Sequence, residues 1–420
     1  MACSIITCLA QDIPLFIYPH LYYIVYKHFF LMYDLYDFFL FEVLFMSFSF
    51  CIPCLFGLEG LVADELRRMD IMDVRPENGR VFFSGTAADC ANVNLNLRCG
   101  ERVLLELGSF PAAGFDALFE GTRALPWADF LPRDAAFPVT GYCLESKLFS
   151  VPDCQRIIKK AIVEQLKTRY HLEHFPETGE EYKIRFSILK DRASLFLDTS
   201  GVALHKRGYR PAHTEASLRE TLAAAMVKLS RYKGKGDFCD PFCGSGTIAI
   251  EAALAALNRA PGLSRGFAAE QWPFFGKSIW EEARNKAIAS EYHGEYRIFA
   301  SDIDPHAIQI AKENAGRAGV AGLITFEASD ASSFSRRTER GVIVTNPPYG
   351  ERLLDRQQAE EIYRAFGSAM SRLPGWQLYL LSSHPDFERC FGTPSDKKRK
   401  LYNGMIQCYL YMYFRQRSSF

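Results

Sequence analysis

The sequence predicts an α/β fold with an open sheet in the second half of the chain, preceded by an α+β module. A short apolar strand at residues 237–240 is followed by a glycine loop and by an apolar helix pattern that starts at Ile248. Two more strand patterns, residues 296–302 and 323–326, each lead to an aspartate. A fourth apolar strand, residues 342–345, runs into Asn-Pro-Pro-Tyr. Strands that alternate with helices in this order are typical of α/β domains.

The composition is that of a folded chain with two or three domains. The 420 residues are 48% hydrophobic and 23% charged, with a formal net charge of +0. A neutral total does not by itself indicate a nucleic-acid partner. Four acidic residues but only one lysine precede Met46, so the rest of the chain is mildly basic. Any affinity for nucleic acid would therefore depend on local basic patches and on salt.

Residues 1–45 form an aromatic-rich leader with little helical or strand periodicity. Charged residues interrupt the leader, so it lacks the uncharged run of about 18 residues that a membrane helix needs. It also lacks the basic start and the small-residue cleavage site of a signal peptide. We expect the leader to lie outside the fold and Met46 to be the natural start.

The N-terminal half mixes helices with antiparallel strands. Residues 153–170 predict an amphipathic helix, with Ile158 and Ile162 on the apolar side. Residues 182–188 alternate with period two, and residues 193–197 follow as a hairpin partner. The helix also has a basic face, which is either a solvated face or a surface that contacts RNA phosphates. The candidate phosphate ligands in this region are Lys147, Arg156, Lys159 and Lys160.

The glycine loop after residue 240 is a candidate ligand site. Gly244 and Gly246 allow the backbone to approach a ligand closely, and the N-terminus of the helix favours a negative group such as a carboxylate. Because Gly244 to Ala249 also fits the G-x-G-x-x-A dinucleotide pattern, a nicotinamide enzyme must be considered. The candidate cofactor residues of this loop are Asp240, Pro241, Cys243, Gly244, Gly246 and Thr247.

The next two strands supply further acids. The strand of residues 296–302 ends in Asp302, which is placed to bind ribose hydroxyls, and Ile303 follows it. Asp304 is the predicted N-cap of a helix that starts at Pro305. Asp330 follows the third strand and is placed to accept from an adenine amino group. Open α/β sheets bind ligands at the carboxyl ends of their strands, where all these acids fall.

The Asn-Pro-Pro-Tyr sequence predicts a loop that binds an exocyclic amine by hydrogen bonds. The side-chain oxygen of Asn346 and the backbone carbonyl of Pro347 can each accept one N–H, which favours a pyramidal nitrogen with an available lone pair. Pro348 stiffens the loop. Tyr349 offers a flat face to a base taken out of its stack. The nicotinamide interpretation does not predict this loop and is therefore disfavoured.

Together these segments resemble the class I, S-adenosylmethionine-dependent methyltransferases. CLFGLEGL at 54–61, LDTSG at 197–201 and LHKRGYR at 204–210 are further similar to the THUMP-containing RNA methyltransferases, and within them to the branch that methylates guanine N2 in large-subunit ribosomal RNA. The resemblance covers residues 49–414. It implies S-adenosylmethionine as cofactor, RNA as partner, and a THUMP fold for the N-terminal module.

The expected organisation is a small α+β unit over residues 46–95, a THUMP module over 96–204 and a methyltransferase domain over 205–420. Residues 205–210 would be both hinge and active-site wall, with Lys206, Arg207 and Arg210 as candidate RNA ligands. An aromatic insert, residues 260–296, would be a lid over the base pocket or local core. The basic run of residues 397–400 leads to an Asn-Gly turn and predicts a C-terminal hairpin.

The 12 cysteines include Cys51 and Cys54 at metal-ligand spacing, but no second pair follows at zinc-finger distance. We therefore expect no metal, no membrane association and a reducing, cytoplasmic location. Three kinds of alternative stay open: guanine-N2 methylation of transfer RNA, methylation of DNA adenine or of protein glutamine, and a non-catalytic RNA-binding assembly factor.

Overall fold

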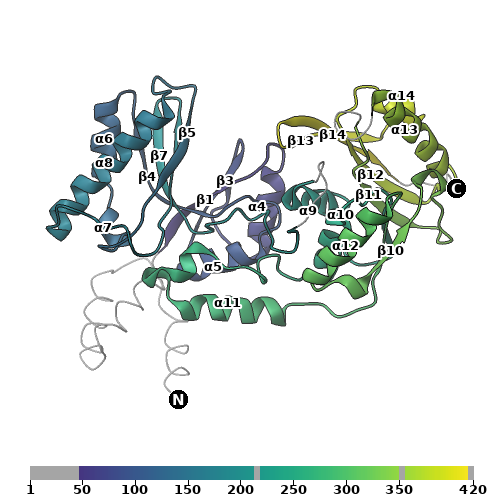
Figure 1. The fold of residues 1–420 in the computed structure, drawn as a ribbon, viewed down its shortest axis with the longest axis horizontal. Coiled ribbons are helices and arrows are strands. Elements are labelled where there is room, and N and C mark those ends of the chain that lie inside the picture. Colours follow the sequence, from purple (N-terminus) through teal and green to yellow (C-terminus); the bar gives the residue numbers. More distant parts are fainter. Residues whose placement is uncertain (1–46, 212–217, 350–354, 415–420) are drawn as a thin grey trace, which may run out of the picture. The chain divides into compact units, whose positions relative to one another are not determined.

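The structure, a computed structural model, describes residues 47–211, 218–349 and 355–414. The predicted leader lies outside these ranges. The sequence also predicts a helix over about 215–230, of which residues 215–217 lie outside them. Residues 47–420 form one compact unit, which contains two seven-stranded sheets. Figure 1 shows the helices and strands along the chain.

The first sheet has the order β2-β3-β1-β4-β7-β6-β5 and is antiparallel except for the β5–β6 pair. Its strands are β1 (Phe48–Pro53), β2 (Arg75–Glu77), β3 (Arg80–Gly85), β4 (Leu104–Pro111), β5 (Val139–Leu144), β6 (Ile184–Leu189) and β7 (Arg192–Asp198). The helices of this half are α4 (Glu59–Arg68), α5 (Ala87–Asn96), α6 (Phe115–Arg123), α7 (Trp127–Phe130) and α8 (Val151–Tyr170).

Helix α8 and the β6–β7 hairpin confirm the periodicity that predicted them. In α8, Ile158, Ile162 and Leu166 are fully buried because they recur at helical spacing on the face that packs against the sheet. The β6 and β7 strands pair antiparallel, with Ile184 opposite Leu197. An N-terminal α+β module is therefore present.

The second sheet has the order β10-β9-β8-β11-β12-β14-β13. Its strands are β8 (Asp237–Asp240), β9 (Arg297–Asp302), β10 (Ile324–Ala328), β11 (Gly341–Thr345), β12 (Trp376–Ser382), β13 (Lys397–Asn403) and β14 (Ile406–Tyr413). The first five strands are parallel, and β13 and β14 form an antiparallel hairpin at one end. From β8 the chain adds β9 and then β10 on one side of the sheet. It then crosses back to add β11 on the other side of β8, so the strand order reverses between β8 and β11.

The helices of the second half of the chain are α9 (Glu220–Leu229), α10 (Thr247–Ala256), α11 (Lys277–Ala289), α12 (Pro305–Arg317), α13 (Arg356–Met370) and α14 (Phe387–Phe391). Helix α11 packs against α5 of the first half. Helix α12 starts as predicted, since the Asp304 side chain accepts from the backbone N–H of His306 and Pro305 is the first helical residue. Helix α9 begins at Glu220, since Arg219 has an extended backbone and is the N-cap. Leu218 is likewise not helical.

The aromatic insert is local core. Trp272, Phe275 and Trp280 are almost completely buried. The Trp272 ring stacks on Tyr182 of the N-terminal module at 4.8 Å, and its N–H donates to the backbone carbonyl of Glu181 at 3.2 Å. These contacts tie the insert to the first half of the chain, as expected of a packed aromatic cluster.

Candidate active site

Four parallel strands end at one edge of the second sheet and bring the predicted site residues together. Asp240 ends β8, Asp302 ends β9, Asp330 follows shortly after β10, and Asn346 directly follows β11. The hydroxyl of Thr345 donates to Oδ1 of Asp240 at 2.7 Å, which links the ends of β8 and β11. These two strands flank the position where the strand order reverses, and open α/β sheets bind their ligands there.

The glycine loop is held in place by the neighbouring strand. The N–H of Gly244 donates to Oδ2 of Asp302 at 2.8 Å, and the N–H of Cys243 donates to the carbonyl of Ser301 at 2.9 Å. Gly246 has φ of 83°, and a Cβ there would lie 3.0 Å from the Cβ of Ala311. Only glycine meets both conditions, so the loop can lie tightly between α10 and α12.

Asp240 has one oxygen without a protein partner. It is 1% exposed, its Oδ1 accepts from Thr345, and its Oδ2 is buried without a hydrogen bond. Burial raises the pKa of this carboxyl to about 7. A buried acceptor of this kind at the glycine loop fits the ammonium group of a methionine moiety, so the residues present suit S-adenosylmethionine.

The two acids predicted to hold the adenosine differ in their surroundings. Oδ1 of Asp302 accepts from the N–H of Asp304 at 3.1 Å, and its Oδ2 accepts from the N–H of Gly244. Each carboxylate oxygen keeps a further lone pair that can accept from a ligand hydroxyl. Asp330 is exposed and caps a short 3₁₀ helix by accepting from the N–H of Ser332 at 2.8 Å. Ile303 is 70% exposed beside Asp302 and presents an apolar face.

The acceptor loop is closed by hydrogen bonds of its own. The hydroxyl of Tyr349 donates to Oδ1 of Asn346. The hydroxyl of Tyr363 on α13 donates to the carbonyl of Pro348 at 2.7 Å. Tyr349 packs against the core, and burial raises the pKa of its hydroxyl well above the usual value. One lone pair of Asn346 Oδ1 and the carbonyl of Pro347 are left to accept from an amine.

Two residues that organise this site were not predicted. Thr345 looks like the last apolar-strand residue in the sequence, and Tyr363 lies in a helix pattern some distance along the chain. Neither belongs to a recognisable motif, because their roles depend on contacts made only after folding.

The structure places Arg207 inside the protein rather than on an RNA-binding surface. Its side chain is 2% exposed, and its guanidinium lies 3.4 Å from Oε1 of Glu251 on α10. It also donates to the carbonyl of Leu204 at 2.7 Å and to that of Arg98 at 2.5 Å. Arg207 therefore joins the two halves of the chain, and its guanidinium is not available to an RNA phosphate, contrary to the prediction.

Arg210 is likewise engaged within the protein. Its guanidinium donates to Oγ1 of Thr247 at 2.9 Å and to the carbonyl of Leu218 at 2.7 Å. It also pairs with Glu220 at 3.3 Å, and both side chains are largely buried. Because Thr247 is the first residue of α10, Arg210 braces the end of the glycine loop, which agrees with the predicted wall but not with a phosphate contact.

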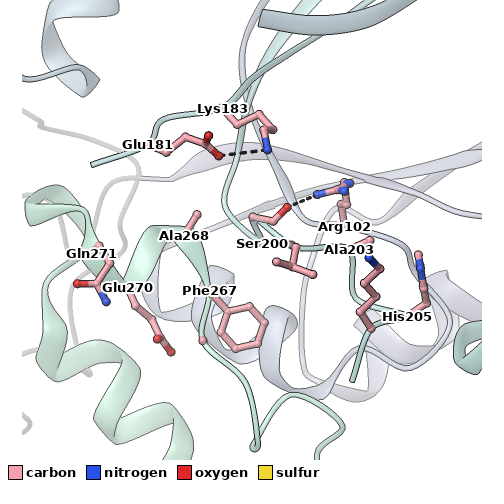
Figure 2. Close-up of a pocket in the computed structure, with 14 residues that line it drawn as sticks. Arg102, Glu181, Lys183, Ser200, Ala203, His205, Phe267, Ala268, Glu270 and Gln271 are labelled. Atoms are coloured by element: carbon pink, nitrogen blue, oxygen red, sulfur yellow. Dashed lines mark hydrogen bonds and ion pairs between the residues drawn. The ribbon is translucent and has the colours of Figure 1, made fainter. Parts of the chain in front are cut away.

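A cavity of about 600 Å³ lies beside the hinge, between the end of β7 and the aromatic insert (Figure 2). Lys206 lines it and is exposed. His205 also lines it, and its Nδ1 lies 2.9 Å from Glu101. Lys206 is thus the residue of this hinge that the structure leaves available to a phosphate.

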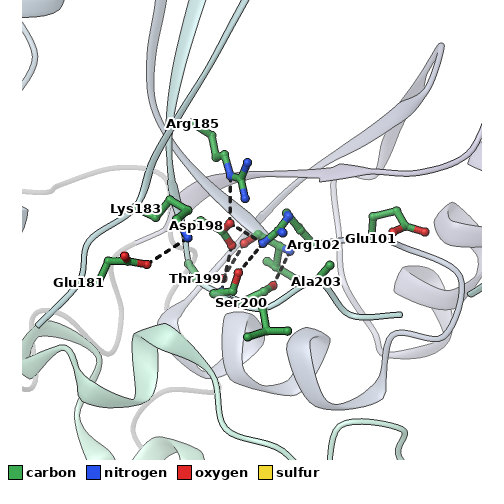
Figure 3. Close-up of polar contacts among 12 residues, drawn as sticks. Glu101, Arg102, Glu181, Lys183, Arg185, Asp198, Thr199, Ser200 and Ala203 are labelled. Carbon is green, nitrogen blue, oxygen red and sulfur yellow. Dashed lines mark hydrogen bonds and ion pairs between the residues drawn. The ribbon is translucent and has the colours of Figure 1, made fainter. Parts of the chain in front are cut away.

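Most of the charge near this cavity is neutralised within the protein. The fully buried Asp198 accepts from Arg102 at 2.6 Å and from Arg185 at 3.1 Å (Figure 3). Lys183 pairs with Glu181 at 3.1 Å. These pairs hold the end of the first sheet together, so the cavity is not a strongly basic site.

The basic residues of the N-terminal module fall into two groups. Lys147, Arg156 and Lys160 are exposed, with Arg156 at 78% for its side chain. Lys159 is half-buried, since it donates to the carbonyl of Phe137 at 3.0 Å and pairs with Glu177 at 2.7 Å. Arg156 pairs with Asp153 on the surface of α8, and a phosphate would compete with that exposed pair.

Within the described ranges, no group of three or more His, Cys, Asp or Glu side chains is arranged to hold a metal ion. The ten cysteines of those ranges are all free thiols. No helix of the described residues is long and apolar enough to cross a membrane.

The parallel sheet, with its glycine loop after β8 and its Asn-Pro-Pro-Tyr loop after β11, has the fold of a class I methyltransferase. Comparison with known families agrees. Residues 207–412 match the methyltransferase domain described as RMKL-like, residues 49–104 match the RlmL ferredoxin-like domain, and residues 112–198 match the THUMP domain. The chain belongs to this family of THUMP-containing, S-adenosylmethionine-dependent methyltransferases.

Two curated relatives show how far the similarity extends. The chain is 46% identical over 361 residues to the "Putative RNA methyltransferase YpsC" of Bacillus subtilis (strain 168), covering 85% of this chain and 94% of that protein. It is 35% identical over 376 residues to the "Ribosomal RNA large subunit methyltransferase K/L" of Psychromonas ingrahamii, covering 87% of this chain but only 50% of the relative.

Two solved structures share the whole architecture. One is described as a predicted N6-adenine-specific DNA methylase from Listeria monocytogenes, with 44% identity, a TM-score of 0.85, and coverage of 91% of this chain and 99% of that one. The other is "SMU.472, a putative methyltransferase complexed with SAH", with 39% identity, a TM-score of 0.84, and coverage of 89% and 99%. Similarity at this level extends to both sheets.

Proposed function

We propose that this protein methylates the exocyclic N2 amine of a guanine in large-subunit ribosomal RNA. The observation that carries the proposal is the pair of acceptors, Asn346 and Pro347, next to the strand that ends in Asp240. A ribosomal RNA methyltransferase among the relatives favours the ribosomal substrate. A cytoplasmic location, which agrees with the ten free thiols, is part of the proposal.

The protein's own residues align two reactants. S-Adenosylmethionine, when bound, supplies a methyl group on a sulfonium. Gly244 and Gly246 would admit its methionine end, Asp240 would accept from the ammonium, and Asp302 and Asp330 would hold the adenosine. Asn346 and Pro347 would accept both N–H groups of the guanine amine and aim its lone pair at the methyl carbon. Alignment of this kind can account for a large share of a reaction barrier.

Placement of the amine would change the hydrogen bonding of Tyr349. Its hydroxyl donates to Asn346 in the structure, so a guanine amine would replace or share that hydrogen bond. Withdrawal of the hydroxyl would also turn the tyrosine ring toward the base, where it could stack as the motif predicts. The exposed cations Lys147, Arg156, Lys160 and Lys206 would contact phosphates and position the RNA without reading its sequence.

Nucleoside mass spectrometry tests this function. Large-subunit ribosomal RNA that lacks the modification is incubated with the protein and labelled S-adenosylmethionine, then digested to nucleosides. We expect label in N2-methylguanosine. Transfer RNA, DNA and a protein mixture serve as parallel substrates.

Each alternative substrate has its own signature. Labelled methyladenosine would overturn the guanine assignment, and label confined to transfer RNA would overturn the ribosomal one. Absence of label from every RNA, with S-adenosylhomocysteine binding shown by calorimetry, would refute the RNA methyltransferase proposal and favour the DNA or protein products tested in parallel.

Cofactor affinity should depend on pH through Asp240. Its raised pKa of about 7 means that the free protein holds a proton there below neutral pH. An ammonium group prefers the ionised carboxylate, so binding of S-adenosylhomocysteine must displace that proton. We expect affinity to fall by up to about tenfold per pH unit below pH 7 and to level off above it, as measured by calorimetry.

Asp240→Asn is the matched control for this pH dependence, because it keeps the shape of the side chain and cannot titrate. We expect weaker binding with a flat profile between pH 5 and 8. The raised pKa of Asp240 also makes the stability of the folded protein depend on pH. Because folding raises this pKa, the carboxyl favours the folded state most at low pH, and that contribution is lost as pH rises through about 7. An unchanged slope in Asp240→Asn would assign the titration to another group.

A further inference from the structure

We propose that the basic edge strand β13 is a binding surface for the RNA phosphate backbone that leads to the acceptor loop. This inference rests on the proposed function, since it adds the route by which RNA reaches the site. Four consecutive cations, Lys397, Lys398, Arg399 and Lys400, lie on this strand. The three lysines are exposed, and Arg399 is half-buried.

The charge of β13 is only weakly compensated. Glu388 on α14 lies 3.3 Å from Lys398, and both side chains are partly open to solvent, at 30% and 55%. Asp396, which precedes the strand, accepts from the backbone N–H of Phe414. Exposed pairs of this kind contribute little, so a phosphate can compete for the lysines. The surface is complementary to a polyanion.

The geometry of an edge strand suits an extended polyanion. β13 is the last strand of its sheet, so its outer edge faces no further strand among the described residues. Alternate side chains of a strand repeat at about 6.8 Å, which is close to the separation of successive phosphates along a nucleic-acid strand. Lys398 and Lys400 point to the same side, where they lie 5.8 Å and 5.5 Å from the rings of Tyr409 and Tyr402.

Apolar side chains flank the lysines. Phe56 is 60% exposed and meets the Tyr402 ring edge-on at 6.5 Å, and Met405 in the hairpin turn is 98% exposed. Large apolar side chains in solvent next to cations are the combination that single-stranded RNA uses, because bases stack on them while the backbone contacts the charges. A protein partner would bury the apolar residues but would have to desolvate the lysines.

The position of β13 connects the acceptor loop with the N-terminal module. At the C-terminal end of the strand, Asn403 lies beside the Tyr349 hydroxyl, as does Cys408 of β14. In the middle of the strand, Arg399 donates to the carbonyl of Gly57, and a Cβ on Gly57 would lie 3.1 Å from the carbonyl of Lys400. Figure 1 shows the β13–β14 hairpin extending from the second sheet toward α4. RNA held on β13 would therefore lie beside both the acceptor loop and the N-terminal module.

The test is a triple variant, Lys397→Gln, Lys398→Gln and Lys400→Gln, which keeps Arg399 because that residue holds Gly57. Lys233→Gln, Lys235→Gln and Lys277→Gln form the matched control, since these lysines are also exposed and lie outside the site. Binding of large-subunit ribosomal RNA by the full chain is measured by filter binding at several salt concentrations. Calorimetry with S-adenosylhomocysteine reports whether the methyltransferase domain is intact.

We expect the β13 triple to bind RNA at least tenfold more weakly than the control triple at low salt. The slope of log K against log salt should fall by about two, since each phosphate contact with a single strand contributes about 0.7. Binding of S-adenosylhomocysteine should not change. Equal RNA affinity and equal slope in the two triples would overturn the β13 surface while leaving the proposed function in place. Failure of the unmodified protein to bind or methylate any RNA would overturn both.

Discussion

Asn346→Ala is expected to abolish methyl transfer while leaving cofactor binding intact. The side-chain oxygen of Asn346 is one of two acceptors that would draw the amine out of the plane of its base, and alanine offers none. Loss of one preorganised hydrogen bond to a reacting group typically costs about 10²–10³ in kcat. The decrease should appear in single-turnover rates with labelled S-adenosylmethionine and unmodified ribosomal RNA.

Two controls separate a chemical role from a structural one. Asn346→Asp retains an acceptor oxygen and should keep more activity than alanine, although its charge disturbs the loop. Tyr349→Phe removes the hydroxyl that donates to Asn346 and keeps the ring, so it should retain the ability to stack a base. S-Adenosylhomocysteine should bind all three variants like the parent. A fully active Asn346→Ala protein would refute the role assigned to this residue.

Arg207→Met is expected to destabilise the fold more than any surface change. The substitution leaves Glu251, which is 1% exposed, as an uncompensated buried carboxylate beside Tyr209, and frees the carbonyls of Leu204 and Arg98. Removing one partner of a buried ion pair costs about 3–5 kcal/mol. For a unit of this size that loss lowers the Tm by roughly 5 °C, as measured by differential scanning calorimetry.

Lys206→Met is the matched control, since it makes the same change at the neighbouring exposed position and should shift the Tm little. Arg207→Met combined with Glu251→Leu removes both charges and should recover part of the loss. If Arg207 instead served mainly to bind RNA, the single variant would keep its Tm and lose RNA affinity. That result would reverse the structural role assigned here.

Sequence reasoning was most successful where a residue's role follows from its neighbours in the chain. The helix that starts at Pro305, the β6–β7 hairpin and the C-terminal hairpin all formed as predicted, because capping, alternation and turn signals act over a few residues. The same local logic placed Asp240, Asp302 and Asn346 at strand ends. Parallel strands then had to bring these ends to one edge, which the sheet order confirms.

Local sequence could not predict which cations are free. Lys206 and Arg207 are adjacent and equally basic in the sequence, yet one is exposed at a cavity and the other is buried against Glu251, 44 residues away. Burial of a guanidinium is set by the acids and carbonyls that folding brings to it, and these come from distant segments.

The fold class and the order of the motifs could thus be predicted from the sequence, since these depend on short patterns of residues. Tertiary structure alone decided that Thr345 links Asp240 to the acceptor strand, that Tyr363 holds Pro348, and that the basic strand β13 lies between the acceptor loop and Gly57. Thr345 and Asp240 meet because parallel strands of one sheet lie side by side, Tyr363 reaches Pro348 because α13 packs near the acceptor loop, and Arg399 reaches Gly57 because the two halves of the chain pack together.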